Sequence, residues 1–442
     1  MRIWGNYRIT TFQIIALGFV LMILVGTLLL MLPISSRQQT GTDFSDCLFT
    51  ATSAVCVTGL VVRDTWAHWS VFGQGVILFL IQIGGMGVVT AALSLSFVSG
   101  RKIGFMQRTV MQEAISAPQV GGIVRLTRFI ILTTFVIELL GAALLSIIYI
   151  PEFGIKGVWY AVFHSVSAFC NAGFDLMGVH GEFASMTAYA QNALVNIVLV
   201  LLITIGGIGF LVWNDVKEHG FRLKQYRLQS KIALSASGIM ILIPFLWLLF
   251  SEMGGTPFRE RILPSLFQSV TLRTAGFNTM DLNSVSGGGQ ALMIVWMLIG
   301  GSPGSTAGGM KTTTGAILLL TALAIFRRKD HVTCFGRRVG EDAVRNAVAI
   351  LMMYFTMFFI GGLVISKAES LPLMSCLFET ASALGTVGLS LGITARIGGV
   401  SRFILIALMF MGRVGGLTLI YAAQSVRRSS CSTLPLEKVT VG

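Results

Sequence analysis

Charged residues are scarce in this chain of 442 residues. They make up 12 % of the sequence, whereas soluble proteins average about 25 %, and hydrophobic residues make up 54 %. The six cysteines include no C-x-x-C pair, no His lies at metal-ligand spacing from them, and the five histidines form no cluster. Paired acids or a Ser/His set at matching depth are also missing, which argues against a polytopic membrane enzyme. The composition indicates a membrane protein without a catalytic centre.

The chain contains several long apolar segments. A helix of about 20 apolar residues spans the roughly 30 Å of hydrocarbon in a bilayer. Such runs predict eight transmembrane helices, at about 11–32, 72–98, 129–150, 189–213, 232–250, 290–325 (interrupted), 346–366 and 403–424. The first run is too long for a signal peptide and no small-residue cleavage site follows it, so it is counted as a span.

The formal charge of +13 predicts orientation in the membrane. If both termini lie inside and the spans alternate, most of the 32 Lys and Arg residues fall in inner segments, and basic loops stay in the cytoplasm. We therefore expect a multi-pass protein of the plasma membrane with both termini cytoplasmic. The basic segments also favour membrane lipid or an acidic partner. Nucleic-acid binding is disfavoured because no soluble domain is predicted.

One short motif occurs four times. The copies are LFTATSAVCVTGL at 48–60, FHSVSAFCNAGF at 163–174, FQSVTLRTAGF at 267–277 and FETASALGTVGL at 378–389. Each has a Phe with Ser or Thr four residues later, at Ser53, Ser167, Thr271 and Ser382, and each ends in Gly and an apolar residue. Each copy lies between two spans. The chain thus divides into pore units at about 1–100, 124–218, 228–330 and 344–428, followed by a cytosolic tail at 429–442.

Four units of this kind predict a fold class. Each unit has two spans, so every unit starts on the same side of the membrane and the repeats are parallel. The segment before each Gly loop is too short to cross the bilayer. We expect an all-α polytopic membrane protein in which four parallel helix–pore-loop–helix repeats surround a pseudo-fourfold pore.

The four loops are the predicted ion-binding filter. None has an acid at its Gly or at the two residues before it, so the polar groups common to all four are backbone carbonyls. Rings of carbonyls replace the hydration shell of potassium in selective filters, and Gly permits the positive φ that such a row needs. Ordinary Gly turns between helices are the alternative. The predicted filter residues are Val57, Thr58, Gly59, Asn171, Ala172, Gly173, Thr274, Ala275, Gly276, Thr386, Val387 and Gly388.

The second span of each unit carries a Gly-rich motif. In the first two units, at 84–87 and 206–209, it predicts close helix packing. In the third unit, GGSPGSTAGG at 300–309 has five glycines and a proline, so it cannot stay helical and is predicted to form an intramembrane gate under the filter. A passive kink is the alternative. The predicted gate residues are Gly300, Gly301, Ser302, Pro303, Gly304, Ser305, Thr306, Ala307, Gly308, Gly309, Lys311 and Arg413.

Four charged side chains within the predicted spans and loops leave two interpretations each. Arg413 takes the place of a Gly in the fourth unit and is expected to face the inner cavity, or else to pair structurally with a carbonyl or an acid. Glu138 lies mid-span and is either functional or a hydrogen-bonded structural acid. Arg273 and Glu379 either pair around the filter or hold its shape.

Together these motifs resemble those of the Trk/Ktr/HKT superfamily of potassium transporters, and most closely the KtrB-type membrane subunit. AVCVTGL, CNAGFD, LRTAGFNT and GTVGLS are similar to that family's four selectivity loops. GGSPGSTAGGMKT is similar to its gating loop, and GRVGG, with Arg413, to its inner-cavity arginine. The similarity extends over essentially the whole chain.

The resemblance implies potassium uptake through a gated pore lined by loop carbonyls. It also implies a homodimer, a cytosolic ring of nucleotide-binding regulatory subunits, and sodium stimulation. In some plant members a Ser replaces the first filter Gly and accompanies sodium permeability, so Gly59 favours potassium. We expect no cofactor bound by this chain, with the potassium ion as substrate. The alternative is a symporter that couples potassium to sodium or protons, which would need a relay of intramembrane acids beyond Glu138.

Overall fold

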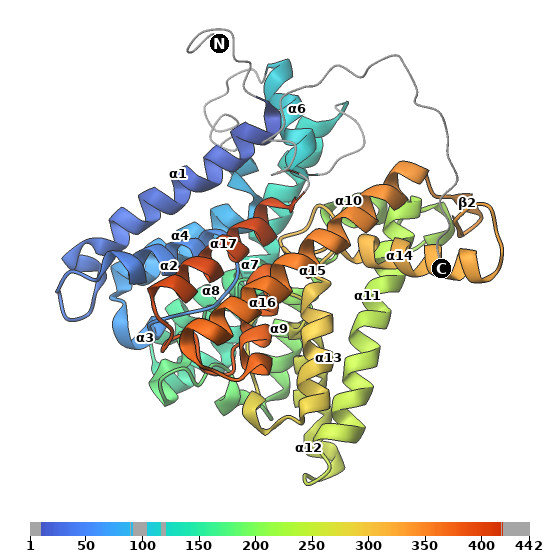
Figure 1. Cartoon of the computed structure of the whole chain (residues 1–442). Coiled ribbons are helices and arrows are strands. Elements are labelled where there is room, and N and C mark those ends of the chain that lie inside the picture. The colour runs from blue at the N-terminus through green and yellow to red at the C-terminus, as the bar shows by residue number, and fades with distance from the viewer. Residues whose placement is uncertain (1–9, 89, 92–103, 116–120, 417, 419–442) are drawn as a thin grey trace.

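A computed structural model describes residues 10–88, 90–91, 104–115, 121–416 and 418 (Figure 1). The described part is mostly helical, with one short hairpin of β1 (Thr333–Cys334) and β2 (Arg337–Arg338). The predicted tail at 429–442 and most of 89–100 in the first unit lie outside the described residues. The expectation of an all-α polytopic membrane protein is confirmed.

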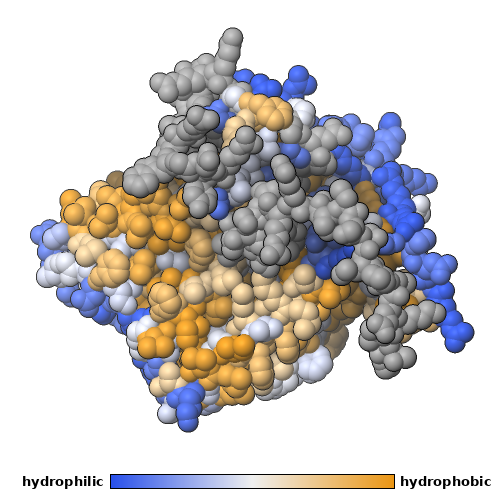
Figure 2. Space-filling view, turned by 45° about the horizontal axis from the view of Figure 1, so that its top comes forward, coloured by the Kyte–Doolittle hydropathy of each residue, from blue (hydrophilic) through white to orange (hydrophobic). Residues whose placement is uncertain are grey.

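Four long apolar helices begin the four units. They are α1 (Thr11–Met31), α7 (Ile123–Phe153), α11 (Leu228–Trp247) with its continuation η5 (Leu248–Glu252), and α15 (Glu341–Glu369). By length and composition each is able to cross a membrane. Only 28–39 % of each apolar window is buried inside the protein. Figure 2 shows the resulting hydrophobic surface, with hydrophilic residues toward its edges.

Four shorter helices lie inside this frame, each ending directly before a filter loop. They are α2 (Phe44–Val55), α8 (Lys156–Phe169), α12 (Phe258–Thr271) and α16 (Leu373–Gly385). The second half of each is buried, including the shared Phe and the Ser or Thr four residues later. Because these C-terminal halves are buried, each helix ends inside the protein, and its C-terminal carbonyls face the loop that follows.

The second helix of each unit departs from the predicted spans. These helices are α4 (Val71–Met86), α9 (Ala193–Gly207) with α10 (Phe210–His219), α13 (Gly287–Leu298) with α14 (Thr312–Phe326), and α17 (Gly399–Val414). The unbroken span expected at 189–213 is wrong, because α9 and α10 meet at 93°. The helices also end before Gly87 and Gly415, which have φ of 86° and 89°. Positive φ is accessible to Gly and is incompatible with a continuing right-handed helix.

The Gly motifs also pack closely, as the sequence predicted. A Cβ at Gly84 would overlap the Val55 carbonyl, and one at Gly206 would overlap that of Phe169. These carbonyls end the short helices α2 and α8. The same motif therefore does two things: its first Gly lets the second helix touch the short helix, and its last Gly breaks the second helix.

Contacts between helices close the four units into a ring. In the first, second and fourth units the first, short and second helices pack on one another, and in the third unit α11 packs on α12, α13 and α14. Between units, the second helix of one packs on the short helix of the next: α4 on α8, α9 on α12, α13 on α16, and α17 on α2. The last contact joins the fourth unit to the first, so the filter loops surround a common centre.

Smaller elements complete the fold. The helix α6 (Phe105–Ile115) packs on α1 and α7 and follows the first unit, while α3 (Thr65–His68) follows the first filter loop. The 3₁₀ turns are η1 (Pro33–Ser35), η2 (Met177–His180), η3 (Thr187–Tyr189), η4 (Leu223–Gln225) and η6 (Leu282–Ser284). The five cysteines of the described part are free thiols, and four of them are buried, as expected of packing residues.

Candidate ion pathway

The four filter glycines form a closed ring. A Cβ added to Gly59 would lie 2.5 Å from the Ala172 carbonyl oxygen, next to Gly173. A Cβ on Gly173 would meet Ala275 and Gly276, one on Gly276 would meet Val387, and one on Gly388 would meet Thr58 and Gly59. Each Gly thus lies against the backbone of the neighbouring unit, with no space for a side chain.

The backbone has the same conformation in all four loops. The residue two before each Gly has positive φ although it has a side chain: Val57 at 55°, Asn171 at 58°, Thr274 at 65° and Thr386 at 52°. The glycines have φ of 70–94°, and the residue between them has an ordinary negative φ. This alternation lets successive carbonyls face the same side of the chain. Non-Gly residues in this region are strained, and such strain gathers at functional sites.

The shared Ser or Thr anchors each loop. In the first and fourth units Ser53 and Ser382 accept hydrogen bonds from the N–H groups of Gly59 and Gly388, at 3.1 and 3.0 Å. In the other two units the hydroxyl donates, at 2.7 Å, to the carbonyl of the Phe after the Gly. The sequence identified these positions, and the structure supplies their role: they fix the loop from behind.

Several buried threonine hydroxyls at the filter have no protein partner in the described part of the chain. Thr58, Thr274 and Thr386 are fully buried and their Oγ1 atoms make no hydrogen bond there. An unpaired buried hydroxyl costs free energy unless something polar binds it. Neutral oxygens from carbonyls and hydroxyls suit a hard cation, and this ring fits a monovalent cation as cargo better than a divalent ion, which carboxylates favour.

The predicted gate segment is a buried loop that crosses beneath the filter. Its ends lie side by side, because the Gly300 N–H donates to the Met310 carbonyl at 2.6 Å. A Cβ at Gly308 would overlap the hydroxyl of Thr386, so the loop touches the filter from below. The segment Gly300–Gly309 has no helix, in agreement with its composition.

Hydrogen bonds hold this loop to two neighbouring units. The N–H groups of Ser302 and Thr306 donate to the carbonyls of Gly207 and Gly206, at 3.0 and 3.2 Å. The N–H of Gly309 donates to the Gly412 carbonyl at 3.1 Å. The acceptors are the Gly motifs where other second helices end or break. The loop is therefore fixed by a few backbone bonds rather than by a continuous helix.

Arg413 reaches across the space under the filter. Its guanidinium donates to the Thr306 carbonyl of the loop and to the Gly84 and Gly85 carbonyls of the first unit, the last at 3.0 Å. Lys311 lies nearby and donates to the Ala307 carbonyl at 2.7 Å. Both line an inner cavity of about 300 Å³. Both interpretations of Arg413 therefore apply: the side chain lines the inner cavity, and its guanidinium donates to backbone carbonyls.

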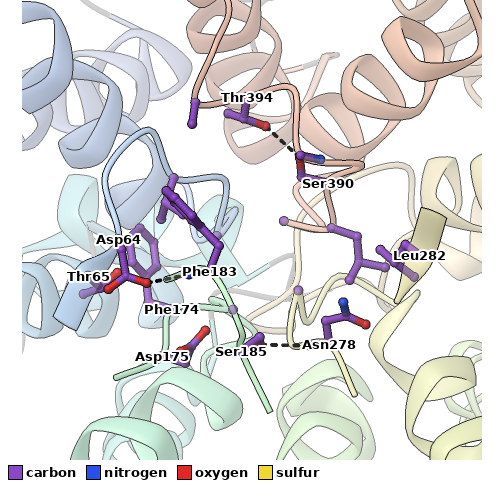
Figure 3. A pocket seen from close by; sticks show the side chains of 18 of the residues that line it. Asp64, Thr65, Phe174, Asp175, Phe183, Ser185, Asn278, Leu282, Ser390 and Thr394 are labelled. Carbon is purple, nitrogen blue, oxygen red and sulfur yellow. Dashed lines mark hydrogen bonds between the residues drawn. The ribbon is translucent and has the colours of Figure 1, made fainter. Parts of the chain in front are cut away.

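The outer mouth is a cavity of about 380 Å³ above the four glycines. Figure 3 shows Asp64 and Asp175 close together, with the Phe183 N–H donating to Asp64 at 2.9 Å. Asp281 and Arg396 also line the cavity. The sequence does not predict that these residues meet, because they follow the filter loops of different units and no motif connects them. The one sequence signal among them is Asp175, two residues after the filter Gly.

Potassium uptake is expected to depend on external pH through Asp175. The pKa of this carboxyl is raised to about 7, chiefly by burial and secondarily by the Asp64 carboxylate. It is therefore charged above about pH 7 and neutral below it. Lowering external pH from 8 to 6 should reduce uptake at low potassium about threefold, the effect of one charge at ~6 Å in water. Asp175→Asn should give low uptake at both pH values, whereas Asp281→Asn should keep the pH step. A step of equal size in Asp175→Asn would contradict this assignment.

Arg273 and Glu379 form no ion pair with each other or with another residue in the described part of the chain. Arg273 donates to the Ser237 hydroxyl at 2.8 Å. Glu138 accepts from Gln82 at 3.2 Å and lies 3.9 Å from the Cys170 sulfur, so it is a hydrogen-bonded acid between two units. The buried His164 accepts a hydrogen bond from the N–H of Leu176 just beyond the second loop, at 3.1 Å. These groups hold the filter from outside.

Glu379 is the most completely bonded of them. Its carboxylate accepts from the hydroxyls of Ser390 and Thr394 and from the N–H of Leu391, at 2.5, 2.6 and 3.2 Å. Glu379→Ala should therefore leave the Leu391 N–H and one of the two hydroxyls, which lie 3.1 Å from each other, without an acceptor, and lower stability by about 2 kcal/mol or more. The measurement is thermal unfolding of the protein in detergent. Glu379→Gln should lower the melting temperature less. Glu341→Ala, which removes an exposed acid, should change the melting temperature little. If Glu379→Ala melted at the same temperature as wild type, Glu379 would not stabilise the loop.

The fold and the pathway define a class of protein. Filter loops from four related units surround a passage with a wide outer mouth, an oxygen-lined ring, and a loop with two cationic side chains beneath. This is the architecture of a helical membrane transporter for cations, not of an enzyme.

Comparison with known proteins identifies the family. The TrkH family, described as cation transport proteins, matches residues 7–430, and the chain belongs to it. The chain is 39 % identical to the potassium/sodium uptake protein NtpJ of Enterococcus hirae, over 98 % of both chains. It is 37 % identical to Ktr system potassium uptake protein B of Bacillus subtilis, over 96 % of this chain and 95 % of that one. The solved TrkH of Vibrio parahaemolyticus shares the fold, with a TM-score of 0.74 at 20 % identity, covering 95 % of this chain and 86 % of that one. The resemblance inferred from the motifs is confirmed.

Proposed function

We propose that this protein takes up potassium through a gated, channel-like pore. The observation that carries the proposal is the ring of four filter loops with one shared backbone conformation. Carbonyls from such loops stand in for the water that a potassium ion sheds. The relatives named above are potassium or potassium/sodium uptake proteins, which supports the same ion for this chain.

Selectivity in this proposal comes from backbone atoms of residues 57–59, 171–173, 274–276 and 386–388. The alternating φ signs and the buried hydroxyl anchors support it, because they set the loop geometry independently of the ion. Gly59 is present, which favours potassium over sodium.

Gating belongs to the loop 300–309 together with Arg413 and Lys311. Their carbonyl contacts support a closed pathway beneath the filter, and a fixed cation there raises the barrier to a passing cation. Opening requires the loop to leave the Gly motifs at 206–207 and 412. Because few backbone hydrogen bonds hold the loop, it is able to adopt a closed and an open position.

The protein acts in this proposal as a homodimer under a cytosolic ring of nucleotide-binding subunits, with both termini cytoplasmic. Two relatives from Bacillus subtilis are named as proteins B and D of a Ktr system. Such names are consistent with a transporter in which the membrane protein works with separate subunits. Nucleotide would be bound by the partner, and this chain would bind no cofactor. The name of the Enterococcus relative includes sodium, which is consistent with sodium stimulation.

A symporter coupling potassium to sodium or protons is the competing function. It would use intramembrane acids as a relay. Glu138 is the acid expected mid-span, and the hydrogen bond that it accepts from Gln82 and its contact with Cys170 favour a structural role.

The test is flux in liposomes that contain the purified protein and a potassium gradient alone. Potassium should move until it reaches electrochemical equilibrium, without movement of sodium or protons in fixed ratio. Accumulation of potassium against its own gradient, driven by sodium or protons, would replace the channel proposal by the symporter. A co-reconstituted ring subunit should change the rate and leave the equilibrium unchanged.

A further inference from the structure

A second polar cavity lies away from the ion pathway. It has a volume of about 570 Å³ and is formed where the start of α7, the end of α10 and the residue before α11 come together. We propose that it binds the phosphate of an anionic membrane lipid, with the headgroup in the cavity and the acyl chains along α7. The proposal concerns lipid binding and does not depend on which ion the protein carries.

The cavity has an excess of positive charge. Arg125, Lys217 and Arg227 reach it from three different elements, and Glu218 is the only acid among its lining residues. Arg227 is already partnered, because its guanidinium lies 3.5 Å from Asp215 and 3.8 Å from Glu218. Arg125 and Lys217 form no ion pair with any residue in the described part of the chain. Two cations are thus left without a counter-charge.

The start of α7 increases this excess. Gly122 precedes the helix with a φ of 78° and supplies no capping side chain, and the first turn has no acid. Arg125 and Arg128 stand there instead, although a helix N-terminus carries partial positive charge. Cations at that end are unfavourable unless an anion offsets them. An anionic headgroup between Arg125 and Lys217 would do so.

The surroundings favour a lipid over a soluble anion. The Lys217 ammonium lies 4.1 Å from the centre of the Phe129 ring, so the cavity has an aromatic wall. Farther along α7, a stripe of exposed apolar side chains begins about 10 Å from Arg125, given a rise of 1.5 Å per residue. These side chains are Leu132, Phe135, Val136 and Leu139. Phe221, which follows α10, is 97 % exposed. Basic pockets between spans on the cytoplasmic side suit anionic headgroups.

The test is native mass spectrometry of the full-length protein in detergent, titrated with phosphatidylglycerol. Wild type should retain this lipid and should bind phosphatidylcholine much more weakly. Each cation at such a surface contributes about 1 kcal/mol, or about fivefold in affinity. Arg125→Gln with Lys217→Gln should therefore weaken phosphatidylglycerol binding about thirtyfold, and Lys217→Gln alone about fivefold.

The matched control is Arg222→Gln with Lys224→Gln. These two exposed cations lie between α10 and α11, close in sequence to Lys217 but outside the lining of the cavity, and their loss changes the net charge equally. The control should bind phosphatidylglycerol like wild type. Equal weakening in both double variants would overturn the proposal, because it would show only general attraction to the surface. Full occupancy by inorganic phosphate alone, with no preference for the lipid, would overturn it in favour of a soluble anion. If the cavity variants kept the lipid but lost a cytosolic protein partner, the cavity would be a protein contact instead.

Discussion

Gly59→Ser should reduce the preference for potassium over sodium at least tenfold, while the protein still folds and transports. The reason is local. A Cβ at this position would lie 2.5 Å from the Ala172 carbonyl oxygen, and the backbone has a φ of 89°, which a serine adopts only with strain. The carbonyl that a serine displaces belongs to the adjacent unit, so one substitution alters two sides of the ring.

A tenfold loss of potassium preference is a small effect for a substitution at this position. It corresponds to about 1.4 kcal/mol, whereas strain at such a backbone position is of order 1–3 kcal/mol. The measurement is the ratio of potassium to sodium flux in liposomes under equal gradients. Gly75→Ser is the matched control, because a Cβ there has nothing within 4 Å. A ratio in Gly59→Ser equal to that of the control would mean that Gly59 does not shape the path of the ion.

Deleting Ser302–Ala307 should raise potassium flux about tenfold or more and weaken any control by a regulatory partner. The deletion removes the bonds to Gly206 and Gly207 and the Thr306 carbonyl that Arg413 contacts. The chain is able to rejoin, because Gly300 and Gly308 already lie in contact and the Gly300 N–H bonds to Met310. Rates are compared by potassium flux per reconstituted protein, and unchanged flux would remove the gate from the proposal.

Two variants of Arg413 distinguish the effect of its charge on flux from the effect of its hydrogen bonds. Arg413→Ala removes the cation and three carbonyl contacts, whereas Arg413→Lys keeps the charge and loses most of the contacts. If the charge is the barrier, flux should rise in Arg413→Ala and stay low in Arg413→Lys. If the contacts matter more, both variants should behave alike, with raised flux or reduced thermal stability.

Much of the fold was predictable because membrane spans and special backbone positions depend on residue type. Apolar length located the long helices α1, α7, α11 and α15. The loop glycines were recognisable because Gly takes positive φ without steric cost and leaves room for close backbone contacts. The breaks in the second helices of the other units were not predicted, since Gly motifs that pack helices and Gly motifs that end them have the same sequence appearance.

The candidate site divides in the same way. The residues of the predicted filter and gate were chosen from sequence motifs, yet the partners of these residues were not predicted. Arg413 contacts Gly85, 328 residues away, and Glu379 bonds to Thr394, which no motif connects to it. The second polar cavity, lined by Arg125 and Lys217, is formed by segments that lie far apart in the sequence.

The sequence by itself located the four long apolar helices, the four copies of the loop motif, and the loop glycines that take positive φ. Each of these depends on the properties of residues close together in the chain. Only the tertiary structure decided which units touch, what the Ser and Thr anchors hold, and which carbonyls Arg413 reaches. Those contacts depend on how the units close into a ring, because a side chain finds its partner through packing of whole helices rather than through its sequence neighbours.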